Sequence, residues 1–331
     1  MKNLSVLQYV LWNAVYQMKI TLKQKKNFSL KKQCYIVNRP FKYLLFVVLS
    51  ISLTSQAQNG NDFIFFEARL QTLANKVLTA VTDSLKEEAN RLLIEDVEEV
   101  LLIKGSFHYN FENIDNLSIL DAPDKSFKLF NWVMPKEDGS FKYFAYLQFY
   151  NKRSKELHFL KLNDTSAHID SEQFKILEGG DWFGALYAEI IHNSFNKKDY
   201  YTLVGWDGNN QFTTKRIIEI LHFSEDHKPI FGAPIIKMND GTHTRMILEY
   251  AKKTSTNMAY NDNSEYIVFD QLEPIDGAEK GMYEFYVPNL SYDGLTFKNG
   301  KWRLVENIPA YNDKKRNRKQ LKNIERGLQA P

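Results

Sequence analysis

Cysteine is almost absent from this chain of 331 residues, because Cys34 is the only one. Residues 58–331 contain none, which excludes disulfides, thiolate zinc sites and cysteine nucleophiles from that part of the chain. Its fold must therefore depend on an apolar core. A chain of this length can form such a core as one large domain or two smaller ones.

Acidic residues are absent from residues 1–57, which contain nine Lys and Arg residues. The formal net charge of +3 and the pI of about 8.6 therefore depend on this segment, and residues 58–331 carry a net negative charge. The basic pI is not a sign of affinity for nucleic acid, and no nucleic-acid partner is expected.

Long apolar runs are also scarce. The run Leu44–Leu53 has about half of the roughly 20 residues that a membrane-spanning helix needs, so no transmembrane span is expected in the mature chain. Arg39 and Lys42 lie near its start, and a small-x-small sequence that ends at Ala57 follows it. Residues 41–57 therefore read as a signal peptide with cleavage after Ala57, which predicts a periplasmic or secreted protein.

Residues 1–40 precede this signal and have two main interpretations. They are either a leader extension or the product of a misassigned start, with translation beginning at Met18 or later. Signal peptides usually have about 15–30 residues, which favours the misassigned start.

Residues 58–103 form the predicted helical segment. Apolar residues recur there mostly at steps of three, four and seven, which predicts one or two amphipathic helices over about 62–94 with a break near residues 82–84. Residues 94–103 fit either a helix or a first strand. The heptad pattern does not persist, so packing on the chain's own β body is favoured over a coiled coil.

Residues 104–312 form the predicted β domain, because aromatic and β-branched runs alternate there with Gly, Asn, Asp and Pro turns. The fold class is therefore mainly β (α+β overall): N-terminal helices and then an antiparallel meander of about twelve strands. The strands fall into three groups, at about 115–163, 183–239 and 243–308. Propeller-like, sandwich-like and incomplete-barrel arrangements all fit. Asn299-Gly300 predicts a two-residue hairpin turn.

The sequence lacks the common catalytic motifs: a glycine-rich phosphate loop, Gly-x-Ser-x-Gly and His-Glu-x-x-His. These absences favour a non-catalytic protein, and no cofactor is implied. Two patterns resemble metal sites but are too irregular to predict one: His222 and His227 with the acids between them for zinc, and the turn 207–210 for calcium. An ordinary hairpin turn is the favoured interpretation of 207–210.

Tryptophan supplies the candidate binding site. Trp182 and Trp206 each adjoin an aspartate, Asp181 and Asp207, near predicted strand ends, where loop-borne sites lie. Exposed aromatic rings can stack on sugars, although a β-rich core also fills with aromatic residues. These four residues are the predicted ligand-binding residues.

Residues 313–331 form a basic tail with seven basic and two acidic residues. It fits either contact with an anionic surface or folding back onto the acidic body. Interleaved aromatic residues for base stacking are absent. The basic residues proposed for surface contact are Lys314, Lys315, Arg316, Arg318 and Lys319.

Three segments, SQAQ, GWDGNNQ and GLTFKNGKWRL, carry a general resemblance. Over about residues 41–308 the chain resembles exported, functionally uncharacterised β-rich proteins of Gram-negative bacteria. The resemblance implies export and transfers no site residue. The expected function is non-catalytic binding of an envelope component or glycan, and the alternative is an exported hydrolase of glycan or peptide with acidic site residues.

Overall fold

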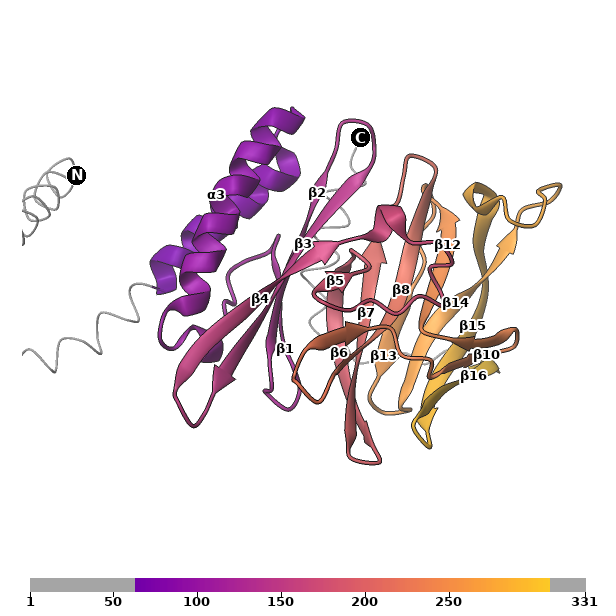
Figure 1. Ribbon diagram of the computed structural model, residues 1–331. Coiled ribbons are helices and arrows are strands. Elements are labelled where there is room, and N and C mark those ends of the chain that lie inside the picture. Colours follow the sequence, from indigo (N-terminus) through magenta and orange to yellow (C-terminus); the bar gives the residue numbers. More distant parts are fainter. Residues whose placement is uncertain (1–62, 310–331) are drawn as a thin grey trace, which may run out of the picture. The chain divides into compact units, whose positions relative to one another are not determined.

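The computed structural model describes residues 63–309, which belong to one compact unit of the chain. In this part, two long helices are followed by sixteen strands that form three sheets (Figure 1). The prediction of a mainly β fold after N-terminal helices is confirmed. The predicted leader, the signal peptide and the basic tail lie outside the described residues.

The first helix occupies residues 63–79 of the described chain, and the second, α3, is Asp83–Leu102. Thr82 caps α3, because its side-chain oxygen accepts a hydrogen bond from the backbone N–H of Leu85. The break therefore lies where the sequence predicts it. Residues 94–102 continue the helix rather than begin a strand. Arg69 and Asp96 join the two helices by an ion pair of 2.5 Å.

The first sheet has the strand order β1-β2-β3-β4-β5. Its first four strands are antiparallel neighbours, whereas β5 pairs parallel with the end of β4. The strands are β1 (Ser118–Asp121), β2 (Lys128–Pro135), β3 (Phe141–Asn151), β4 (Glu156–Asp164) and β5 (Asp181–Trp182).

The middle sheet has the order β12-β8-β7-β6. Its fifth strand, β9, pairs antiparallel with the last residues of β8, Leu221–Phe223. Its neighbouring strands pair antiparallel throughout the described residues. The strands are β6 (Leu186–Phe195), β7 (Lys198–Asp207), β8 (Thr213–Phe223), β9 (Pro229–Phe231) and β12 (Arg245–Ala251).

The third sheet has the order β11-β10-β16-β15-β14-β13, with β10 and β16 parallel. Asn299 and Gly300 join its two long C-terminal strands and both have positive φ, 51° and 75°, as a type I′ turn requires, so the predicted hairpin is confirmed. The strands are β10 (Ile236–Met238), β11 (Gly241–His243), β13 (Met258–Asn261), β14 (Tyr266–Pro274), β15 (Tyr286–Lys298) and β16 (Lys301–Ile308).

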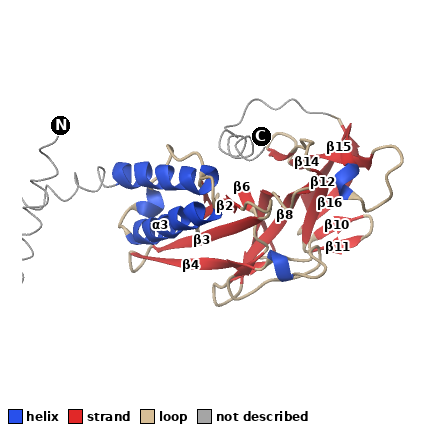
Figure 2. Cartoon of the chain, turned by 90° about the horizontal axis from the view of Figure 1, so that it is seen from above, coloured by secondary structure: helices blue, strands red, loops and turns tan. Residues whose placement is uncertain are grey.

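Three apolar cores fill the spaces between these elements. The helices pack on one face of the first sheet, as Figure 2 shows along β3 and β4. The opposite face packs on the middle sheet, whose other face packs on the third. Strand β2 contributes to two cores, because successive side chains of a strand point to opposite faces of the sheet. Phe130 and Trp132 face the helices, while Leu129 and Val133 face the middle sheet.

The three predicted strand groups correspond broadly to the three sheets, with one exchange. Strand β10, from the middle group, lies in the third sheet beside β11, while β12, from the third group, joins the middle sheet. A simple meander is therefore wrong in detail, and the count of about twelve strands is not confirmed. Most of the additional strands have only two to four residues. Each sheet keeps two edges, so the described residues do not form a closed barrel.

Neither of the two helices in residues 63–309 is both long and apolar enough to cross a membrane.

Candidate functional site

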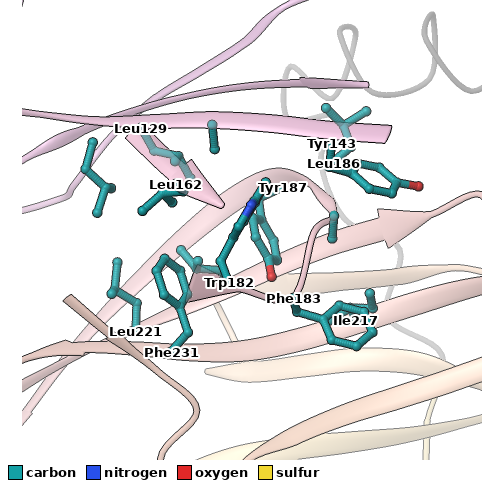
Figure 3. Close-up of a cluster of buried hydrophobic side chains, with 14 of the residues drawn as sticks. Leu129, Tyr143, Leu162, Trp182, Phe183, Leu186, Tyr187, Ile217, Leu221 and Phe231 are labelled. Atoms are coloured by element: carbon teal, nitrogen blue, oxygen red, sulfur yellow. The ribbon is translucent and has the colours of Figure 1, made fainter. Parts of the chain in front are cut away.

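The two predicted tryptophans lie at strand ends but are buried. Trp182 ends β5 and is 0% exposed, and its ring lies 5.8 Å from that of Tyr187 and 6.4 Å from that of Phe231, between centroids (Figure 3). Trp206 is 2% exposed and packs edge-on against Phe141. Both rings therefore serve the core, and neither offers a face to a sugar ring in this conformation.

The two predicted aspartates occupy different surroundings. Asp181 is half-buried and has one long hydrogen bond, from the Nδ2 of Asn163 at 3.4 Å. Asp207 is buried, and its Oδ1 accepts hydrogen bonds from the hydroxyl of Tyr143 at 2.7 Å and the backbone N–H of Asn209 at 2.8 Å. The second contact closes the turn after β7.

Tyr143 links the β4–β5 pairing that contains Trp182 to Asp207 at the end of β7. Its backbone N–H donates to Oδ2 of Asp164, which pairs with Trp182 between β4 and β5, and its hydroxyl donates to Asp207. The backbone N–H of Gly208 in turn donates to the Tyr143 hydroxyl at 2.8 Å. The first sheet and the β7–β8 turn are thus joined by one buried tyrosine.

Burial sets the protonation behaviour of this group. It raises the pKa of Asp164 and of Asp207, against the opposing effect of their hydrogen bonds. It also raises the pKa of Tyr143 well above its ordinary value, and the neighbouring Asp207 adds to that rise. Burial lowers the pKa of Lys252, whose Nζ donates to the carbonyl oxygens of Gly208 and Asn210. The ammonium thus clamps the turn that carries Asp207.

A second buried polar cluster lies on the same face of the middle sheet, and its centre is Glu219 on β8. Oε1 of Glu219 accepts from Nε of Arg245 at 2.7 Å, and Oε2 accepts from the hydroxyl of Tyr187 at 2.6 Å. Glu219 and Arg245 are both 0% exposed. Nη2 of Arg245 also donates to Oε1 of Glu219, whereas Nη1 donates to the backbone carbonyls of Glu172 and Lys175, so Arg245 holds the loop 165–180 against the sheet.

The aromatic ring of Phe183 lies close to both cations of this region. The guanidinium carbon of Arg245 is 5.2 Å from the ring centroid, and Nζ of Lys215 is 5.9 Å from it. Lys215 also binds both carboxylate oxygens of Glu172 at 3.0 Å. Each cation of the cluster is therefore paired with a carboxylate, Arg245 with Glu219 and Lys215 with Glu172. Such pairing is needed because burying an unpaired charge is energetically costly.

Sequence reasoning missed Glu219, Arg245 and Tyr143. One signal was present: Glu219 is a lone acid inside an otherwise apolar run, Ile217 to Leu221, and such runs are typical of strands buried on both faces. A charge in such a run needs a buried partner of opposite charge. The identity of that partner, Arg245, depends on the pairing of β8 with β12, which the sequence leaves open.

His192, Ser194 and Asp199 form a Ser-His-Asp grouping at the β6–β7 hairpin, and their geometry does not match a catalytic triad. The same ring nitrogen, Nε2 of His192, lies 2.9 Å from Asp199 Oδ1 and 3.5 Å from the Ser194 hydroxyl. A triad needs the acid on one ring nitrogen and the nucleophile on the other. Moreover, the Ser194 hydroxyl donates to Asp199. The three residues hold the β6–β7 hairpin.

The two metal patterns also resolve into turns. Asn210 Oδ1 accepts from the backbone N–H groups of Phe212 and Thr213, so its side chain closes the turn after β7. His222 is buried in β8, whereas His227 is exposed in the following turn. In the described part of the chain, no three His, Cys, Asp or Glu residues are grouped so that they could hold a metal ion.

No known protein family matches the chain, and no curated protein sequence is significantly similar to it. The geometry of the described residues is therefore the basis for a functional assignment.

Proposed function

We propose that the chain is an exported protein that binds another component of the cell envelope, or a glycan, without catalysing a reaction. Export is supported by the signal sequence that ends at Ala57 and by the acidic, cysteine-free composition of residues 58–331. We also infer a propeller-like stack, in which successive sheets pack face to face without closing, and the two inter-sheet cores support this inference.

One observation carries the non-catalytic assignment: the two buried acids, Glu219 and Asp207, are already held by the protein's own donors. Both oxygens of Glu219 accept hydrogen bonds from Arg245 and Tyr187, and Asp207 accepts from Tyr143. A general acid or base must instead reach the proton that it transfers. Asp207 therefore anchors the middle sheet to Tyr143 of the first sheet, and Glu219 anchors strands β6, β8 and β12 of the middle sheet to one another.

A hydrolase is the second candidate, and a specific feature favours it. Burial raises the pKa of Asp207 and lowers that of Lys252, and opposite shifts of neighbouring acidic and basic groups are common in active sites. However, both side chains already hold the turn after β7: Asp207 accepts a hydrogen bond from the backbone N–H of Asn209, and Lys252 donates one to the carbonyl oxygen of Gly208. These contacts argue against a hydrolase.

Export can be tested by producing the full chain in a Gram-negative host and sequencing the N-terminus of the exported form. Cleavage after Ala57 predicts a new N-terminus at Gln58, in its free or cyclised form. An intact chain confined to the cytoplasm would contradict the proposal. An Ala57→Leu variant is the control, because a bulky residue at the cleavage site should block processing without changing residues 58–331.

Binding without catalysis can be tested with purified residues 58–331 and isolated envelopes or peptidoglycan sacculi from the same host. Sedimentation measures binding, and mass spectrometry of the supernatant measures soluble products. We expect retention on one of these fractions with no product above the protein-free control. Products that disappear with Asp207→Asn would support the hydrolase instead.

A further inference from the structure

The hairpin between β14 and β15 carries an unusual concentration of exposed apolar side chains. Of the fourteen large hydrophobic residues that are well exposed in residues 63–309, five lie between 275 and 290. Contiguous exposed apolar surface commonly marks a site of interaction. We call these five the hairpin surface: Ile275, Met282, Tyr283, Phe285 and Leu290.

The same hairpin is acidic. Between residues 273 and 284 it has four acids and one lysine, and all five side chains are exposed. A partner for this surface should therefore combine apolar side chains with positive charge. The charged residues are Glu273, Asp276, Glu279, Lys280 and Glu284.

The pairing of the last two strands points to the chain's own C-terminus as that partner. The final pair of β15 and β16 is Tyr292 with Ile308. The residues 286–291 of β15 have no strand partner on the β16 side within residues 63–309. Because the strands are antiparallel, chain beyond Ile308 that keeps this direction runs along this open stretch towards the hairpin.

Leu290 lies in the middle of the open stretch. Its side chain is 86% exposed, and its backbone has φ of 69°, which a leucine adopts only at an energetic cost. Strain combined with full exposure of a large apolar residue is typical of a position kept for a contact.

Residues 310–331 have the composition that this surface requires. They contain the seven basic residues of the tail, and Leu321, Ile324 and Leu328 follow at steps of three and four. A segment of 22 residues reaches at most about 70 Å when extended, several times the length of the open stretch of β15. Reach therefore does not limit docking.

We propose that residues 310–331 dock along the open edge of β15 and over the hairpin surface, with their basic residues against the hairpin's acids. This inference goes beyond the proposed function and does not depend on export. It assigns the basic tail to an intramolecular contact rather than to an anionic surface.

Hydrogen exchange measured by mass spectrometry on residues 58–331 tests the proposal by following the peptides that cover 275–291. Reversing the tail charge with Lys314→Glu, Lys315→Glu and Arg316→Glu should increase exchange there roughly threefold or more, because surface ion pairs and the edge contact are lost. Reversing the hairpin with Glu279→Lys and Glu284→Lys should do the same. Combining both sets should restore slow exchange.

The matched control reverses two exposed charges far from the hairpin in sequence, Lys152→Glu and Arg153→Glu in the β3–β4 turn. It should leave exchange at 275–291 unchanged. Equal exchange in all variants would overturn the proposal. Protection that grows with protein concentration would also overturn it, since the occupant would then be a second copy of the chain.

Discussion

At the scale of single residues, Glu219 and Arg245 form the pair whose disruption should cost most. Glu219→Gln removes the charge partner of a guanidinium that is 0% exposed. Removing one member of a buried ion pair costs about 3–5 kcal/mol, so urea unfolding should show a loss of that order. The control is Glu88→Gln on the exposed ion pair with Arg91, which should leave the unfolding midpoint unchanged. Equal effects of the two substitutions would contradict the structural role of Glu219.

Asp207 should give the stability a recognisable pH dependence. Because burial raises its pKa in the folded state above the ordinary value of 3.8, the folded protein binds the proton more tightly than the unfolded chain does. Stability from this group is therefore fullest below pH 3.8 and falls as the pH rises to the folded pKa. Asp207→Asn removes this slope, so the difference in unfolding free energy between wild type and variant should change across that window. A constant difference from pH 3 to pH 8 would contradict the raised pKa.

The candidate residues show what could be predicted at this scale. The positions of Trp182 and Trp206 beside aspartates at strand ends follow from the turn signals around them. Their burial does not follow, because the strands around them are buried on both faces and alternation then loses its meaning. Whether these four residues bind a ligand stays a prediction.

At the scale of elements, the β15–β16 turn depends on two separate properties of Gly300. Its φ is positive, and an added Cβ would overlap the ring of Phe195 from the β6–β7 hairpin. Gly277 has a similar φ but no atom within 4 Å of such a Cβ. Gly277→Ala should therefore cost about 1 kcal/mol, the backbone strain alone, and Gly300→Ala about 1–3 kcal/mol. Equal losses in thermal unfolding would show that the contact with Phe195 contributes nothing.

The same pair of strands shows a limit of prediction from local signals. The sequence predicts two short strands, 282–287 and 295–298. In the structure, Tyr283–Phe285 form a 3-10 turn, and β15 then runs as a single strand from Tyr286 to Lys298. Pro288, Asn289 and Gly294 resemble turn residues, yet Pro288 pairs with β14 and Gly294 pairs with both β14 and β16. The strand accommodates these residues because its register is irregular on both sides near Tyr292. Local turn propensity is weaker than the backbone hydrogen bonds that two neighbouring strands supply.

At the scale of the whole molecule, each core contains its own tryptophan reporter. Trp132 lies between the helices and the first sheet, Trp182 between the first and middle sheets, and Trp302 between the middle and third sheets. Since the first and middle sheets each contribute to two cores, we expect the layers to unfold together. Trp206 lies in the same core as Trp182, so variants that keep one of the three reporters should carry Phe at the other two and at Trp206. These variants should show coincident midpoints in urea. Separated midpoints would show that the layers unfold independently.

The three-sheet organisation could be predicted because turn-rich connections separate the strand groups. The placement of β10 in the third sheet and of β12 in the middle sheet could not be predicted. In strands of three to seven residues, the alternation of apolar and polar residues is too short to indicate which of two apolar sheets the strand joins. The parallel pairing of β10 with β16 joins segments that are more than sixty residues apart, and no local signal specifies it.

Our central proposal is that the chain is exported and binds an envelope component or a glycan, while its buried acids serve only the fold. The most direct test is the product analysis of isolated envelopes incubated with residues 58–331, compared with the Asp207→Asn variant. The account predicts that the protein sediments with the envelope and releases no soluble fragment above background. Fragments released by the wild type and not by Asp207→Asn would contradict it.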